Sequence, residues 1–373
     1  MTGFLKTVES YQHGAQTMPG RYYTAPEILA LEHERLFARH WISVGRAAEF
    51  ARRGGYRLLE IAGESLIVLR DQQGTLRAFF NICRHRGTRL CEAAHGHLSE
   101  TIQCPYHAWT YGLDGRLIGA PHMNEIPGFD KKDYPLHAAA TAEWEGFVFV
   151  CLASDPQPFT EAYAPVLNRF QRFNLPALVT VRRIEYDVRA NWKLVMQNYS
   201  ECLHCPTIHP ELSTKLPYTS GANDLVEGSF LGGYMEIKAP NQSATMSGNS
   251  CGLLLGDLPP DDRRRAFYYT LFPTMMLSLH PDYVVYYTVR PTGPTATRVI
   301  CEWMVHPDSP AAPGYNIQDA EEFWDRTNRQ DWNICERSQL GIASRRYQPG
   351  PYSPRESVPA AWDREYLRQL GPV

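Results

Sequence analysis

The sequence predicts an α+β chain in which a small all-β module is inserted into a larger domain of antiparallel sheet and covering helices. From about Trp41, short apolar runs such as YRLLEI, SLIVLR, LRAFFNI and GFVFVCLA alternate with Gly-rich or polar turns, which is typical of antiparallel strands. Four later runs, FYYTLFP, MMLSLH, YVVYYTVRP and TRVICEWMVHP, indicate an antiparallel meander. We therefore expect a small domain at 40–155 and a larger one formed by 1–39 and 156–373.

Three segments have the periodicity or signals of helices. Residues 25–40, APEILALEHERLFARH, predict an early helix, and a second helix is expected over 191–205. A long helix is expected over about 320–344, with Asp319 and Glu322 placed as a capping box. These helices would cover the larger sheet.

Composition excludes several classes of function. The 373 residues are 43% hydrophobic with a net charge of -3, so we expect a globular protein with a small-molecule substrate and no nucleic-acid partner. The N-terminus lacks a secretory pattern, and the longest compact apolar run, 147–153, is too short to span a membrane, so a cytoplasmic location is expected. Nine cysteines argue against a disulfide framework and for metal ligands or buried thiols.

Two cysteine–histidine pairs stand out inside the β module, Cys83-Arg-His85 and Cys104-Pro-Tyr-His107. Each pair can lie on one loop tip, and two neighbouring tips could surround a metal centre. Tetrahedral zinc uses such a Cys₂His₂ set. A Rieske 2Fe–2S cluster, in which two histidines replace two cysteines on one iron, uses it as well. Zinc sites more often pair cysteine with cysteine and histidine with histidine, which favours the cluster.

A second constellation lies in NYSECLHCPTIHP, which contains His204 and His209. Two histidines and a carboxylate are the usual ligands of an oxygen-activating non-haem iron. Residues five apart turn about 140° from each other on a regular helix, so a distortion is needed, and Pro206 is expected to supply it. Cys202 and Cys205 form a C-x-x-C, which we interpret as buried packing because no second such pair exists.

The sequence around the two cysteine–histidine pairs, CRHRGTRL followed by CPYHAWTYGLDGRLIGAP, resembles the Rieske signature of ring-hydroxylating oxygenase large (alpha) subunits. The resemblance implies that Cys83 and Cys104 bind one iron of a 2Fe–2S cluster and that His85 and His107 bind the other. It also implies an all-β Rieske module inserted in a helix-grip catalytic domain.

The segment NWKLVMQNYSECLHCPTIHP resembles the mononuclear-iron motif of the same family, which implies that His204 and His209 bind Fe(II). Glu201 stands where the family commonly has an aspartate that bridges a Rieske histidine of one subunit to an iron histidine of its neighbour. The resemblance therefore implies a catalytic role for Glu201 in electron transfer. Glutamate at this position resembles the branch that contains carnitine, glycine betaine and stachydrine oxygenases.

The family's third iron ligand is a carboxylate on the C-terminal helix. In this sequence Asp331 lies on one helical stripe with Phe323 and Thr327. Asp325 and Glu336 fall off that stripe and are expected to face solvent. Asp331 is therefore the predicted third ligand.

Hydroxylation with O₂ needs two electrons, whereas a Rieske cluster stores one. The sequence contains no G-x-G-x-x-G fingerprint, flavin motif or plant-type ferredoxin run, so a separate NAD(P)H reductase, with or without a ferredoxin, is expected to supply the electrons. Because the family assembles as head-to-tail trimers, the resemblance implies a homotrimer.

The leading hypothesis is a monooxygenase that hydroxylates a C–H next to a quaternary or tertiary amine nitrogen, with N-demethylation or C–N cleavage following. Hydroxylation or dihydroxylation of an aromatic or other hydrophobic substrate is the alternative, and a Rieske electron-transfer protein is an alternative from another class. Tyr268, Tyr283, Tyr286 and Tyr287 could form a cage for a trimethylammonium group. Because such residues are more often ordinary strand residues, none is assigned a binding role.

Overall fold

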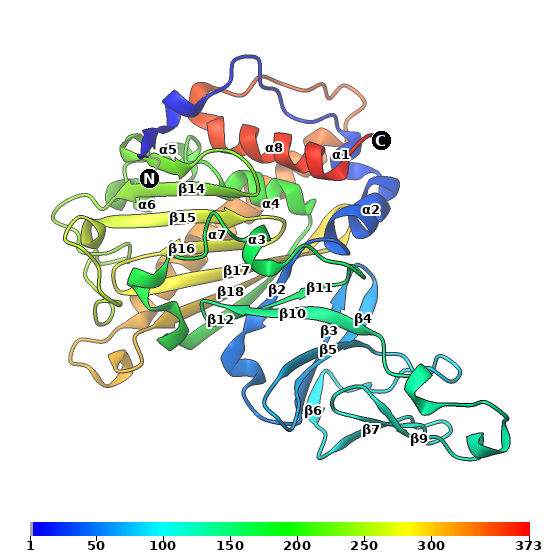
Figure 1. Ribbon diagram of the computed structural model, residues 1–373. Helices are drawn as coiled ribbons and strands as arrows, with labels where there is room; N and C mark the ends of the chain where they lie inside the picture. The colour runs from blue at the N-terminus through cyan, green and yellow to red at the C-terminus, as the bar shows by residue number, and fades with distance from the viewer. Residues whose placement is uncertain (1–2) are drawn as a thin grey trace. The chain divides into compact units, whose positions relative to one another are not determined.

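The structure is a computed structural model that describes residues 3–373, and it divides into two compact units (Figure 1). One unit contains the residues up to 32 together with 165–373, and the other contains 33–164. The second unit is therefore an insertion in the first. The domain limits predicted from the sequence, 40–155, lie inside the inserted unit and stay a prediction. No helix within residues 3–373 combines the length and the apolar character needed to cross a bilayer.

The larger unit is built on an eight-stranded antiparallel sheet. Its strands β15 to β18 form the predicted meander, and β16 is buried at every residue, so both of its faces are covered. In sheet order the strands are β1 (Leu5–Lys6), β13 (Ala222–Leu225), β14 (Phe230–Glu236), β15 (Arg265–Leu271), β16 (Met275–Leu279), β17 (Tyr283–Gly293), β18 (Ala296–Val305) and β12 (Val179–Val188).

Helices α4, α7 and α8 of the larger unit pack against strands β17, β12 and β14 respectively, and α4 contacts both other helices (Figure 1). The helices of this unit are α1 (Arg21–Thr24), α2 (Pro26–Glu32), α4 (Trp192–Tyr199), α5 (Cys205–Ile208), α6 (Pro210–Lys215), α7 (Ile317–Ile342) and α8 (Ser357–Leu370). Its 3₁₀ turns are η1 (Thr7–Ser10), η6 (Gln171–Phe173), η7 (Leu175–Ala177), η8 (Tyr218–Ser220), η9 (Asp262–Arg264), η10 (Ser309–Ala311) and η11 (Pro354–Glu356).

The inserted unit consists of a seven-stranded and a three-stranded antiparallel sheet. In sheet order the strands are β2 (Ile42–Arg46), β11 (Phe147–Cys151), β10 (Ala138–Trp144), β5 (Leu76–Phe80), β4 (Glu64–Arg70), β3 (Gly55–Ile61) and β6 (His95–His97), then β7 (Thr101–Gln103), β8 (Thr110–Gly112) and β9 (Leu117–Gly119). Its helical segments are the π-helix η2 (His33–Phe37), η3 (Ala47–Phe50), η4 (Met123–Glu125), η5 (Lys131–Asp133) and α3 (Phe159–Ala162).

The long C-terminal helix is present, but its predicted capping box is wrong. Helix α7 begins at Ile317 after Asn316, which makes no side-chain capping bond. Asp319 lies in the first turn, and its carboxylate accepts a hydrogen bond from the backbone N–H of Ser247 at 3.1 Å. The carboxylate thus holds a distant loop instead of capping its own helix.

A buried carboxylate fixes the position of helix α4. Glu32, at the end of α2, is fully buried and accepts hydrogen bonds from Trp192 Nε1 at 2.8 Å, Lys193 Nζ at 2.5 Å and Tyr366 Oη at 2.5 Å. Burial lowers the pKa of Lys193, and the charge of Glu32 offsets part of that effect. Either charge alone would be buried without compensation, so the pair is stable only when both members are present.

Replacing Glu32 with Gln should lower the free energy of unfolding by about 3–5 kcal/mol, because the charge of Lys193 loses its buried partner. The matched control is Glu27→Gln on the exposed side of the same helix α2. This control should change the free energy of unfolding by less than about 0.5 kcal/mol. Urea unfolding of the holoprotein measures both values, and equal stability of Glu32→Gln and wild type would contradict the role given to this pair.

Candidate metal centres

Two five-residue loops of the inserted unit, 83–87 and 104–108, close in the same way. The N–H of Gly87 donates to the carbonyl of Cys83 at 3.0 Å, and the N–H of Ala108 donates to the carbonyl of Cys104 at 3.1 Å. Both closing residues have positive φ, 75° at Gly87 and 54° at Ala108. This conformation costs a residue with a Cβ about 1–2 kcal/mol, so the loop contacts must hold Ala108 in place. The two loops therefore have matching backbone frames for their cysteine and histidine.

The cysteines and histidines on these two loops differ in how far they are buried. Cys83 and Cys104 are buried, whereas His85 is exposed and its ring stacks on Trp109 with 4.9 Å between ring centroids. The Nδ1 atom of His107 is buried and has no hydrogen-bond partner among residues 3–373. A buried imidazole nitrogen without a partner fits an atom that would bind iron. Two inner thiols and two outer imidazoles together fit the ligand set of a Rieske cluster.

Tyr111 is a supporting residue of this centre that the sequence did not reveal. Its hydroxyl oxygen accepts a hydrogen bond from the N–H of Arg84 at 3.0 Å and lies 3.3 Å from the Sγ of Cys83. Burial raises the pKa of the Cys83 thiol, and the hydrogen bond with Tyr111 lowers it in part. A hydrogen bond to a ligating sulfur tunes the potential of an iron–sulfur cluster, so Tyr111 stands where it could do this.

Helix α4 positions the second group of candidate ligands, but it is shorter than predicted. The helix begins after its N-cap Asn191 and ends at Tyr199, so the prediction of a helix over 191–205 is wrong beyond that residue. In the following turn the carboxylate of Glu201 accepts the backbone N–H of His204 at 3.3 Å. Pro206 lies in the first turn of the next helix, α5, where a missing backbone N–H costs little. Because α4 has already ended at Tyr199, the helix breaks before the proline.

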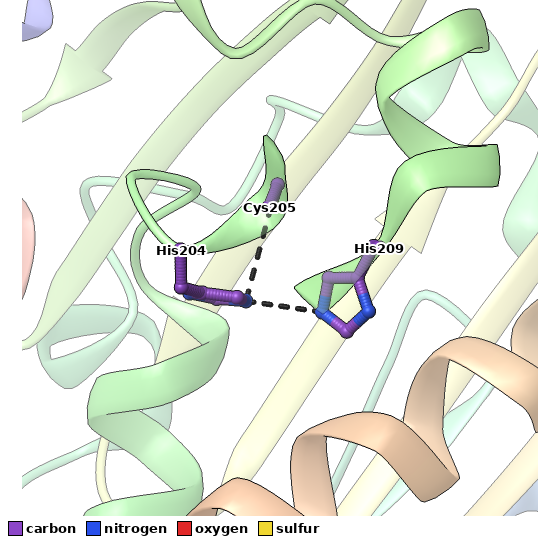
Figure 2. Close-up of side chains that lie close together, drawn as sticks. All are labelled: His204, Cys205 and His209. Carbon is purple, nitrogen blue, oxygen red and sulfur yellow. Dashed lines mark hydrogen bonds between the residues drawn. The ribbon is translucent and has the colours of Figure 1, made fainter. Parts of the chain in front are cut away.

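His204, His209 and Asp331 converge on one point in the larger unit. The two Nε2 atoms are 3.1 Å apart (Figure 2), and Asp331 Oδ1 lies 2.8 Å from His209 Nε2 and 3.2 Å from His204 Nε2. Metal–ligand bonds of about 2.1 Å at right angles would place donor atoms about 3.0 Å apart. A single cation could therefore contact all three atoms, as in a two-histidine, one-carboxylate iron site.

Two further side chains orient the imidazoles. Glu201 Oε1 lies 2.5 Å from Nδ1 of His204, and Gln330 Oε1 lies 2.7 Å from Nδ1 of His209. An acceptor on each Nδ1 leaves Nε2 available for a metal, as is common for ligating histidines. Gln330 is a supporting residue that the sequence did not reveal, because its one signal there is its position beside Asp331.

The electrostatics of this group favour a positive charge between the ligands. Burial lowers the pKa of His204, but Asp331 and Glu201 outweigh burial and raise it to about 10. Burial raises the pKa of Asp331, but hydrogen bonds with His204 and His209 outweigh burial and lower it. A bound metal cation would provide the positive charge that the two carboxylates stabilise.

Cys205 lies beside the histidines but forms a disulfide with Cys202, so the interpretation of both as packing thiols is wrong. Its Sγ is 3.8 Å from His204 Nε2, and the Cys205, His204 and His209 ligand atoms lie within 4.8 Å of one another (Figure 2). A thiolate, and not a disulfide sulfur, is the usual cysteine ligand. The carboxylate of Asp331 is therefore the better third donor.

The buried face of α7 includes part of the stripe predicted by periodicity. Phe323 and Thr327 of that stripe are buried, and so is Trp332 beside it, whereas Asp331 lies at the edge of this face with a side chain 14% exposed. Asp325 accepts the hydroxyl hydrogen of Tyr186 at 2.7 Å. The predicted choice of Asp331 thus coincides with the carboxylate that contacts Nε2 of both histidines, although the buried face is wider than the predicted stripe.

The histidines and Asp331 open onto a pocket of the larger unit. Its empty volume, mouth included, is about 1080 Å³. The lining also includes polar residues and a set of aromatic side chains. Among the lining residues are Tyr199, Glu201, Tyr218, Tyr268, Tyr287, Trp324 and Arg355.

Comparisons with known proteins identify the family of the chain. Residues 40–130 match the model of the Rieske [2Fe-2S] domain, and residues 175–371 match that of the ring hydroxylating alpha subunit (catalytic domain). The glycine betaine monooxygenase oxygenase subunit of Chromohalobacter salexigens is 32% identical over 375 residues, which cover 92% of this chain and 83% of the relative. The carnitine monooxygenase oxygenase subunit of Escherichia coli is 36% identical over 203 residues, which cover 53% of this chain and 54% of the relative.

A solved structure has the same fold. The quaternary ammonium Rieske monooxygenase CntA in complex with L-carnitine matches with a TM-score of 0.76 and 23% sequence identity, covering 95% of this chain and 96% of that chain. The chain therefore belongs to the family of ring-hydroxylating alpha subunits, which are Rieske-type non-haem iron oxygenases. The predicted α+β fold with a Rieske domain and a catalytic domain is confirmed, as are the predicted cofactors, a Rieske 2Fe–2S cluster and a mononuclear iron. A Rieske domain combined with a catalytic domain also excludes the alternative of an electron-transfer protein and favours the cluster over zinc.

Asp331→Ala should abolish turnover and remove the mononuclear iron while the visible spectrum of the 2Fe–2S cluster stays unchanged. The matched control is Asp325→Ala on the same helix, whose carboxylate pairs with Arg329 at 2.9 Å instead of with the histidines. Iron and acid-labile sulfide analysis of the purified variants measures the outcome. Full iron content or retained activity in Asp331→Ala would reject this ligand.

Proposed function

We propose that this chain is a terminal oxygenase that hydroxylates a C–H next to a quaternary ammonium nitrogen. The observation that carries the proposal is a cluster of aromatic rings in the pocket onto which His204, His209 and Asp331 open. The names of the relatives, glycine betaine and carnitine monooxygenase oxygenase subunits, support the same substrate class. A separate NAD(P)H reductase, with or without a ferredoxin, would supply the electrons.

Four aromatic rings of the pocket are in contact with one another. Tyr199 lies 6.2 Å from Tyr268 and 5.6 Å from Tyr287 between ring centroids, and Trp324 lies 6.3 Å from Tyr268. All four line the pocket. The electron-rich faces of such rings attract a cation that cannot donate hydrogen bonds, as a trimethylammonium group cannot.

The four tyrosines that had no assigned role from the sequence differ in whether they line the pocket. Tyr268 and Tyr287 line it, whereas Tyr283 and Tyr286 are buried outside it. The hydroxyl of Tyr283 donates to the carbonyl of Ala244 at 2.5 Å. Only two of the four candidates are therefore placed to face a substrate.

The proposed reaction converts C–H, O₂, two electrons and two protons into C–OH and H₂O. When the hydroxyl group on the carbon bonded to nitrogen loses its proton, the C–N bond breaks with its electron pair going to nitrogen, which gives a carbonyl compound, a tertiary amine and a proton. When bound, the two iron centres supply electron storage and oxygen activation. We propose as their ligands Cys83, His85, Cys104 and His107 for the cluster and His204, His209 and Asp331 for the mononuclear iron.

Glu201 is the proposed connection between the two centres in a homotrimer. Its carboxylate contacts Nδ1 of His204 at 2.5 Å while its side chain stays 13% exposed. The histidine side of the Rieske loops is open as well, since His85 is exposed. The exposure of His85 leaves the histidine side of the Rieske loops accessible to another subunit, which supports transfer between neighbouring subunits. A relative's structure is described in terms of inter-subunit electron transfer.

Glu201→Gln should keep both metal centres and slow the oxidation of the reduced cluster about 10- to 100-fold, because the carboxylate that contacts His204 is lost. Stopped-flow absorbance with substrate and O₂ measures this rate. Glu211→Gln, a nearby acid that pairs with Arg326 at 3.1 Å, serves as the control and should leave the rate unchanged. An unaltered rate in Glu201→Gln would exclude the connection.

Substrate-dependent O₂ uptake tests the proposed function. The holoprotein with a generic NADH reductase should consume O₂ and release aldehyde when given quaternary ammonium compounds. Aromatic acids and naphthalene should give no stimulation above background. Stimulation by aromatic compounds alone would replace this proposal with ring hydroxylation.

A further inference from the structure

We propose that Arg355 binds a carboxylate of the substrate, so that the enzyme selects zwitterionic quaternary amines over cationic ones. This inference rests on the proposed function and deepens it. Among residues 3–373, the acidic and basic side chains that line the pocket are Glu201, His204, His209, Asp331 and Arg355. The first four are linked by direct contacts at the candidate iron site. Arg355 is the one guanidinium among these described lining residues, and no ion pair joins it to that network.

The backbone around Arg355 is held firmly. Arg355 belongs to η11, whose Ser353 and Glu356 form a capping box: Ser353 Oγ accepts the N–H of Arg355 at 3.2 Å, and Glu356 Oε2 accepts the N–H of Ser353 at 2.8 Å. The turn η11 also packs against η1 and the start of α8. These backbone contacts fix the position of Arg355 in the pocket lining.

The guanidinium itself has no carboxylate partner. Its central carbon lies 5.3 Å from the ring centroid of Tyr218, another lining residue. Within residues 3–373, no acidic side chain lies within ion-pair distance of it, whereas Arg368 in the following helix pairs with Glu365 at 2.7 Å. Stacking on Tyr218 leaves the guanidinium N–H groups available for an incoming anion.

The charges of the pocket therefore match a molecule with two opposite charges. The aromatic cluster suits a quaternary ammonium group, and the fork of N–H groups on Arg355 suits a carboxylate. With Fe(II) bound, the charges of Glu201 and Asp331 would offset the charge of the metal, which leaves Arg355 as the uncompensated positive group of the described lining. A zwitterion would thus bind in one direction, with its carboxylate at Arg355.

Two ligands that differ in whether they carry a carboxylate test the contact between Arg355 and a substrate carboxylate. Glycine betaine and choline carry the same trimethylammonium group, but one ends in a carboxylate and the other in a neutral hydroxyl. Calorimetry on the holoprotein gives the Kd of each compound, and O₂ uptake gives kcat and KM. The variants are Arg355→Gln, Arg355→Lys and the control Arg346→Gln, an exposed arginine outside the pocket lining. L-Carnitine is measured as a longer zwitterion.

Wild type should bind at least one of the zwitterions more tightly than choline. Arg355→Gln should weaken binding of that zwitterion about 10- to 100-fold and leave choline unchanged. Arg355→Lys should restore part of the affinity, and Arg346→Gln should match wild type. An equal loss for choline, or no loss for the zwitterion, would overturn the role of Arg355 while quaternary amines remain substrates. If wild type neither binds nor oxidises any of the three compounds, the proposed function fails and this inference fails with it.

Discussion

The buried contact between Glu32 and Lys193 determines where helix α4 lies, and the iron site depends on that position. Next to this contact, the N–H of Asn191 donates to Gln339 Oε1 at 2.9 Å, which ties the start of α4 to α7. Helix α7 carries Asp331, and α4 leads into the turn that carries the histidines. The separation of the carboxylate from the imidazoles is therefore set by contacts in the core of the larger unit.

Charge is distributed unevenly over the pocket. Asp331 and Glu201 contact the imidazoles and stabilise a cation there, whereas Arg355 is the one group of the described lining that would attract an anion. The same lining contains four contacting aromatic side chains. Such an arrangement orients a dipolar molecule by electrostatics as well as by shape, which would limit the number of its C–H bonds that reach the iron.

Much of the site could be predicted from the sequence because its chemistry requires rare residue types at short spacings. The loops with Cys83 and Cys104 and the histidine pair are of this kind. Gln330 and Tyr111 escaped prediction because they act through contacts between segments distant in the sequence. The end of α4 at Tyr199 was also missed, since the carboxylate of Glu201 competes for backbone N–H groups in the turn that follows. The strand meander was predictable from apolar runs alone.

The insertion of one unit within the other has a consequence for synthesis on the ribosome. The inserted unit is complete once residue 164 has emerged. Glu32 precedes that unit, yet its partner Tyr366 follows 334 residues later, close to the C-terminus. The larger unit can bury this carboxylate with all its partners only when the chain has been made as far as Tyr366. The unit that begins first along the chain is thus completed after the unit inserted in it, and its candidate iron site can form only after residue 331 has been made.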